Sequence, residues 1–256
     1  MSVLGRSALV IGLSLMAAAC GRKGPLIYPD MLIPAAPAAV TALQSGSSVK
    51  LQLTLPDKDR AGRPLQGMAG VKISRRAAKT GLTDVCRSCM TDYRLLETLY
   101  LDHLPVAAQR LGSHLVVIDS DVSSGNSYSY SIVPFTADGV DGASSTTVDV
   151  RMAPPLPAPV LKAESFPTEI KLQISTQSLI SGRLLGYNLY RSSGAGARSY
   201  LPLNGEPLQG NEYIDRTLER GVRYRYSARA LFMPATGDMA ESVESDGVEG
   251  MLKDDE

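Results

Sequence analysis

Two cysteines and two histidines are the side chains whose type and spacing could do chemistry in this chain. Cys86 and Cys89 form a C-x₂-C pair within "DVCRSCMTDY" at 84–93, and His103 and His114 follow downstream. The pair suits zinc, although it is only half of the usual ligand signature. Met90 stands where c-type haem attachment requires a histidine. Zinc binding, a redox pair and a structural disulfide remain as alternatives, and no βαβ pattern surrounds the pair to favour redox chemistry.

The remaining sequence offers no catalytic constellation. Its serine-rich loops lack a G-x-S-x-G elbow, and no G-K-[ST] follows the glycine-rich "SSGAGARS" at 192–199, which favours a hairpin loop over a phosphate site. "DSD" at 119–121 lacks the further ligands that calcium needs. We therefore predict a protein that is not an enzyme, with no catalytic residues, no cofactor and no metal.

The overall charge does not favour a nucleic-acid partner. Lys and Arg number 26, as do Asp and Glu, and no long charged run occurs. Apolar residues make up 44% of the chain, which is enough for packed cores. With no Trp and only three Phe, the interior must be filled by Val, Ile, Leu and Tyr.

An internal repeat supplies the elements that must position these residues. The frame I-D-x-x-[V/L]-x-x-G-x-x-Y-x-Y occurs at 118–130 and again 96 positions later at 214–226. Two earlier blocks recur in the same order, which indicates two copies of one domain. These blocks are "SVKLQLTLP" at 48–56 with "EIKLQIS" at 169–175, and "GVKISR" at 70–75 with "GYNLYR" at 186–191.

The repeated blocks have the period of β-strands. Apolar and polar residues alternate through 49–55 and 170–174, which is typical of half-buried antiparallel strands. About seven short strands in roughly 100 residues, separated by Gly, Ser, Asp and Pro, predict a β-sandwich. We therefore expect an all-β protein of two tandem immunoglobulin-like sandwiches.

The shared [V/L]-x-x-G-x-x-Y frame resembles the E–F corner of fibronectin type III domains. The resemblance implies that Gly125 and Gly221 form the turn, while the hydroxyls of Tyr128 and Tyr224 bond back to the preceding backbone and pin the corner. It covers two fibronectin type III-like domains, at 36–152 and 157–252. One departure is that Leu53 and Ile174 stand where such domains usually carry a core tryptophan.

The first copy contains an insertion that the second lacks. Gly70 and Ile118 lie 48 positions apart, whereas Gly186 and Ile214 lie 28 apart. This C-to-E region holds Cys86, Cys89 and both histidines. It is therefore the part of the first domain that differs most from the second copy.

The N-terminus has the marks of a secretory signal peptide. Arg6 is followed by the uncharged stretch Ala8–Ala19, and Gly21–Pro25 ends it abruptly. A helix of twelve residues would cover about 18 Å, which is too short to span a hydrocarbon core of about 30 Å. Residues 1–19 are therefore predicted to be removed.

The end of this segment resembles a bacterial lipobox. "AAAC" at 17–20 implies that Cys20 is acylated, with chains such as palmitate, and becomes the mature N-terminus. "CGRKGPL" at 20–26 is similar to the CG-x-KGPL start of small lipoproteins associated with the lipopolysaccharide translocon. Gly21, in place of an aspartate, implies transport to the outer membrane. Proline-rich linkers at 20–35 and 153–156 and an acidic tail at 253–256 complete the domain plan.

Lipidation of Cys20 would leave two thiols in an exported protein. An oxidising compartment and a four-residue turn through Arg87 and Ser88 favour a Cys86–Cys89 disulfide, and the tip of this loop is a candidate contact site.

We predict a non-catalytic lipoprotein of the outer membrane, with its domains facing the periplasm or the cell surface. It would serve as a spacer and binding module for envelope protein or polysaccharide. The alternatives are an accessory factor of an envelope machine such as the lipopolysaccharide translocon, contacted through residues 20–26, and a metal or redox protein centred on Cys86 and Cys89.

Overall fold

The computed structural model describes five stretches of the chain: residues 28–79, 92–177, 182–194, 199–234 and 238–254. Cys20, Cys86 and Cys89 lie outside these residues, as does the predicted signal peptide. Within the described stretches, no helix is long and apolar enough to cross a membrane.

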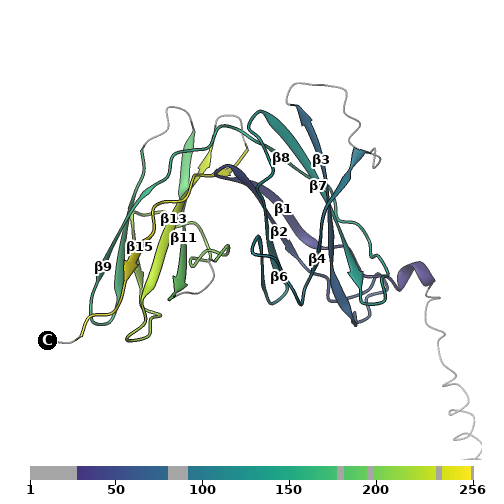
Figure 1. Cartoon of the computed structure of the whole chain (residues 1–256), viewed down its shortest axis with the longest axis horizontal. Coiled ribbons are helices and arrows are strands. Elements are labelled where there is room, and N and C mark those ends of the chain that lie inside the picture. The colour runs from purple at the N-terminus through teal and green to yellow at the C-terminus, as the bar shows by residue number, and fades with distance from the viewer. Residues whose placement is uncertain (1–27, 80–91, 178–181, 195–198, 235–237, 255–256) are drawn as a thin grey trace, which may run out of the picture.

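The first half of the chain forms two facing antiparallel sheets (Figure 1). One sheet has the order β1-β2-β6-β5 and the other has the order β4-β3-β7-β8. The strands are β1 (Ala38–Ser45), β2 (Ser48–Thr54), β3 (Met68–Lys79), β4 (Arg94–Tyr100), β5 (Ala108–Leu111), β6 (His114–Asp119), β7 (Asn126–Thr136) and β8 (Val148–Arg151). The C-to-E insertion of the first copy contributes β4 and β5.

The second half repeats this plan in reduced form. One sheet has the order β12-β10-β9, and the other is built on β13, with β11 on one side and β14 and β15 on the other. The strands are β9 (Val160–Ser165), β10 (Ile170–Ser175), β11 (Arg183–Ser193), β12 (Glu212–Asp215), β13 (Tyr224–Met233), β14 (Ala240–Glu241) and β15 (Val248–Gly250). Where the first sandwich has β4, the second has only an isolated bridge between Tyr187 and Leu208.

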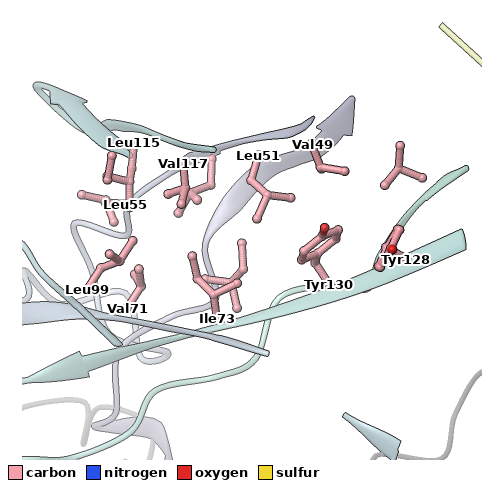
Figure 2. Close-up of a cluster of buried hydrophobic side chains, with 14 of the residues drawn as sticks. Val49, Leu51, Leu55, Val71, Ile73, Leu99, Leu115, Val117, Tyr128 and Tyr130 are labelled. Carbon is pink, nitrogen blue, oxygen red and sulfur yellow. The ribbon is translucent and has the colours of Figure 1, made fainter. Parts of the chain in front are cut away.

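Each sandwich buries its own apolar core. Figure 2 shows the first core, in which Val49, Leu51 and Leu115 from one sheet face Ile73 and Tyr130 from the other. The second core is built in the same way around Ile170, Leu172, Leu189 and Tyr226, and lacks tryptophan like the first. The predicted all-β fold of two tandem immunoglobulin-like, fibronectin type III-like sandwiches is confirmed.

The two sandwiches are joined through a shared sheet. Strand β14 pairs antiparallel with β13 and parallel with β1, so that Gln44 lies opposite Ala240 and Ser45 opposite Glu241. A single hydrogen-bonded path therefore runs from β11 in the second sandwich to β5 in the first. The repeat does not predict this link, because it indicates the strands within each copy and not a contact between the copies.

Part of the predicted N-terminal linker is attached to the first sandwich. A short 3₁₀ turn, η1 (Pro29–Met31), begins the described chain, and the backbone of residues 31–35 exchanges hydrogen bonds with residues 58–61. Pro34 also accepts a bond of 2.9 Å from the backbone N–H of Ala143. This stretch therefore lies on the sandwich and does not act as a free spacer.

Candidate functional site

The candidate residues of the metal and redox alternatives are only partly within the described chain. Cys86 and Cys89 lie outside it. His103 and His114 are both exposed, one in the turn after β4 and the other at the first residue of β6. Among the described residues, no group of three or more His, Cys, Asp or Glu side chains is placed to hold a metal ion.

The two predicted corner tyrosines have the same geometry. The Tyr128 hydroxyl accepts a hydrogen bond of 2.9 Å from the backbone N–H of Ser123, and the Tyr224 hydroxyl accepts one of 2.9 Å from that of Glu219. The donor lies five residues upstream in each copy. Gly125 and Gly221 have φ values of 83° and 75°, in the left-handed region that glycine adopts without strain.

A charged cluster beside each corner is also duplicated. Arg75 pairs with the buried Asp119 at 2.8 Å, and Tyr130 donates to the same carboxylate at 2.8 Å. Arg191 and Tyr226 bond Asp215 in the same way, at 2.6 and 2.9 Å. The aspartates occupy matching positions of the repeat frame, and each arginine ends a matched block, but the sequence analysis did not single out the arginines.

The electrostatics of the second cluster keep its carboxylate ionised. Burial raises the pKa of Asp215, but hydrogen bonds from Arg191, the Thr217 N–H and Tyr226 outweigh burial and hold the pKa below its usual value. Burial and the nearby Asp215 carboxylate raise the pKa of Tyr226, so that its hydroxyl remains a donor. These groups serve as a structural brace, because every polar atom of the Asp215 carboxylate is already occupied.

The junction between the sandwiches has a buried ion pair at its centre. Lys50 of β2 contacts Glu241 of β14 at 2.5 Å, and the two side chains are 4% and 0% exposed. Ser45 donates to the other carboxylate oxygen of Glu241 at 2.6 Å, while Asn188 and Tyr190 donate at 2.7 and 3.1 Å. One carboxylate thus collects two donors from each sandwich.

The surroundings of this pair fix its charges. Burial raises the pKa of Glu241, but Lys50 and the donors from Ser45 and Asn188 outweigh it and hold the pKa below its usual value. Burial lowers the pKa of Lys50, and the attraction of Glu241 opposes that effect. The alternation in 49–55 puts Lys50 on the polar face of its strand, and the second sandwich covers this face.

Three further contacts surround the buried pair. The Gln44 side chain exchanges two bonds of 2.9 Å with the backbone of Ala153, in the linker between the sandwiches. Leu156 accepts a bond of 2.9 Å from the N–H of Val243. The linker between the sandwiches is thus held at both Ala153 and Leu156. On the other side of the junction, the Tyr200 N–H and hydroxyl donate to the Gln109 side chain and the Val106 carbonyl, at 2.7 and 3.0 Å.

A cleft of about 610 Å³ opens beside this junction. The β1–β2 turn, residues 45–48, forms one wall, and residues 243–247 form another. Its floor includes Arg225, Ser227 and Arg229 of β13, whose side chains share the outer face of that strand, together with residues 190–192 of β11. A smaller hollow of about 190 Å³ shares part of this lining and extends to Lys50 and Tyr200.

The cleft is lined by hydroxyl and charged groups. Seven of its residues are serines, and they stand among Arg191, Arg225, Arg229, Glu244 and Asp246. The lining residues include no histidine or cysteine, so no serine here has the imidazole base that would make it a nucleophile. The arrangement is suited to holding a polar ligand by hydrogen bonds.

These features define a tandem immunoglobulin-like protein with a polar cleft at the joint between its domains. Comparisons with protein-family profiles and with curated protein sequences give no match. Among solved structures, the chain is similar to the crystal structure of the chicken CNTN1 FN1-FN3 domains, with 14% identity and a TM-score of 0.33. That match covers 87% of this chain and 68% of the other. The assignment of the fold rests on the strand order of the two sandwiches.

Proposed function

We propose that this chain is a non-catalytic lipoprotein of the outer membrane that holds two fibronectin type III-like domains as one stiff arm. The arm would act as a spacer and present binding surfaces to envelope protein or polysaccharide. The observation that carries this proposal is the junction, where a shared sheet and a buried ion pair join the two sandwiches. A flexible tether would need neither feature.

The placement of the two ends supports a spacer role. η1 lies at one end of the long axis of the molecule and the C-terminus at the other (Figure 1). An acyl anchor on Cys20 would be only nine positions from Pro29, where the chain begins to attach to the first sandwich. An anchor at that end would leave the second sandwich as the part furthest from the lipid.

The test uses the full chain in its native host, with a photo-crosslinking residue at an exposed position of the second sandwich. We expect a reproducible set of envelope adducts that is lost in Cys20→Ala, which removes the anchor. The same adducts should be lost in Glu241→Lys, which sets two cations against each other in the junction. Adducts that survive Glu241→Lys unchanged would contradict the stiff-arm proposal.

The competing accessory-factor hypothesis makes a different prediction. If residues 20–26 are themselves the contact, exchanging residues 21–26 while retaining Cys20 should abolish function with anchoring and the junction intact. Under our proposal, that exchange leaves the adducts of the second sandwich unchanged.

A further inference from the structure

We infer that the cleft beside the junction binds a saccharide that carries an anionic group, with Arg225 receiving the anion. This inference rests on the proposed function, because it names the site and the ligand class of the binding module. Three features of the cleft support it: the hydroxyl-rich lining, the pairing of its charges and the space left by one glycine.

Among the arginines of this region, Arg225 differs in its partners. Arg191 pairs with Asp215, Arg229 with Glu244, and Arg223, just outside the cleft, with Glu249. Arg225 is exposed, and its side chain makes no hydrogen bond or ion pair with any residue that the structure describes. Its guanidinium therefore offers a planar fork of donors, the geometry that carboxylate and phosphate groups match best.

The Arg225 guanidinium lies directly against Gly247. A Cβ atom at Gly247 would lie 2.6 Å from Nη2 and 2.7 Å from Cζ of Arg225, so the guanidinium rests against the bare glycine backbone. A similar relation holds across the cleft, where a Cβ at Gly46 would approach Nη1 of Arg229 at 3.3 Å.

The rest of the lining favours a sugar over a peptide or a nucleic acid. Ser47, Ser192 and Ser227 supply hydroxyls that can both donate and accept, as the hydroxyls of a pyranose ring require. Tyr190 is buried, and Val243 is the one exposed large apolar side chain of the lining, so an apolar peptide anchor has little to pack against. Asp246 and Glu244 nearly balance the local charge, unlike the basic surface that nucleic acid needs.

The inference is tested by calorimetric titration of the full acylated chain in nanodiscs. Trigalacturonate and glucose 6-phosphate are the two anionic sugars, and maltotriose is the neutral one. We expect at least one anionic sugar to bind. Arg225→Gln should lower the affinity for that sugar by about tenfold or more, because it removes a charge-assisted hydrogen bond. Arg223→Gln removes the same charge from a surface pair outside the cleft and should leave the affinity within about twofold.

A second variant tests the position of the arginine without removing its charge. Gly247→Ala should push the Arg225 guanidinium aside and weaken binding of the same ligand. In the Arg225→Gln background, Gly247→Ala should cause no further loss of affinity. The inference is overturned by no binding of either anionic sugar at concentrations on the order of 10 mM, or by equal weakening from Arg223→Gln. It is also overturned if inorganic phosphate or tetraglutamate binds as tightly as the sugars, which would indicate a plain anion or peptide site.

These results are separable from the stiff-arm test. The variants that probe the cleft leave Lys50 and Glu241 intact, and the variants that probe the junction leave Arg225 intact. A cleft that binds no sugar would thus overturn this inference without touching the proposed function.

Discussion

Replacing Lys50 with methionine removes the charge at the centre of the junction while keeping most of the side-chain volume. Glu241, with 0% of its side chain exposed, would lose its ammonium partner. Removing one member of a buried ion pair destabilises by about 3–5 kcal/mol, because the other charge stays buried. Ser45, Asn188 and Tyr190 still donate to the carboxylate. We therefore expect a loss near the lower end of that range, about 3 kcal/mol.

The second copy of the repeat provides a matched control. Lys171 occupies the same place in its K-L-Q block and pairs with Glu212 at 2.7 Å, but these side chains are 29% and 41% exposed. Water can solvate either partner when the other is removed, so surface pairs of this kind contribute little. Lys171→Met should thus change the free energy of unfolding much less than Lys50→Met.

Two measurements check this prediction. Denaturant unfolding can be followed by circular dichroism, since the chain has no Trp. Distances between spin labels, one on each sandwich, report whether the junction stays closed. We expect Lys50→Met to lower the stability and to broaden the distance distribution, because opening the junction lets water reach Glu241. If Lys50→Met and Lys171→Met behave alike in both measurements, the assigned role of the buried pair is wrong.

The same variant predicts a change in acid sensitivity. In the wild type, the pKa of Glu241 lies below its usual 4.5, so its contribution is present above that pH and is lost as the pH falls through the lowered value. Without Lys50, burial dominates and the pKa of Glu241 should rise. The stability difference between wild type and Lys50→Met should therefore begin to shrink as the pH falls through the raised pKa of the variant, and should shrink further below 4.5, where the wild type loses its own contribution.

Three further predictions concern the corners and the cysteines. Tyr128→Phe and Tyr224→Phe each remove one hydroxyl, and we expect each to lower the stability of its domain by about 0.5–1.5 kcal/mol; unchanged unfolding midpoints in both would remove the corner role. Cys20→Ala should leave an uncleaved precursor without acyl mass, whereas cleavage before residue 20 without added lipid would disprove the lipobox. In protein taken from the envelope, Cys86 and Cys89 should resist alkylation until reduced. Two free thiols would refute the disulfide, and stoichiometric zinc would replace it with the metal hypothesis.

The architecture of each sandwich was predictable because it is encoded locally. Strict alternation in 170–174 places Ile170, Leu172 and Ile174 in the core, and the structure has all three buried. The repeat doubled this signal and located both corners. A strand that buries one face against its own domain leaves a period of two in the sequence, and that period does not depend on what the other face contacts.

The junction was not predictable for the same reason. Lys50 and Lys171 sit in matching "KLQ" blocks, yet one is buried beside Glu241 and the other is at the surface. What separates them is the partner that packs on the outer face, and that partner comes from a two-residue strand almost 200 positions away. Periodicity within a block carries no information about such a contact.

The duplicated arginines are a different case, because a signal for them was present. Arg75 and Arg191 end the two matched blocks "GVKISR" and "GYNLYR", and the aspartates they pair with occupy matching positions in the later frame. An arginine and an aspartate that recur together in both copies indicate a pair retained by the fold. Considering the blocks jointly, and not one at a time, would have found the cluster.

The junction and the cleft are coupled because they share the same turn. Residues 45–48 contribute Ser45 to the buried cluster and, through Gly46 and Ser47, one wall of the cleft. The other wall, residues 243–247, begins two positions after Glu241. A ligand that touches both walls can bind only when the sandwiches are closed on each other, so it must stabilise the closed junction by the free energy of its own binding. The ion pair that stiffens the arm therefore also preforms the cleft, and loosening the pair should weaken any ligand held between the two walls.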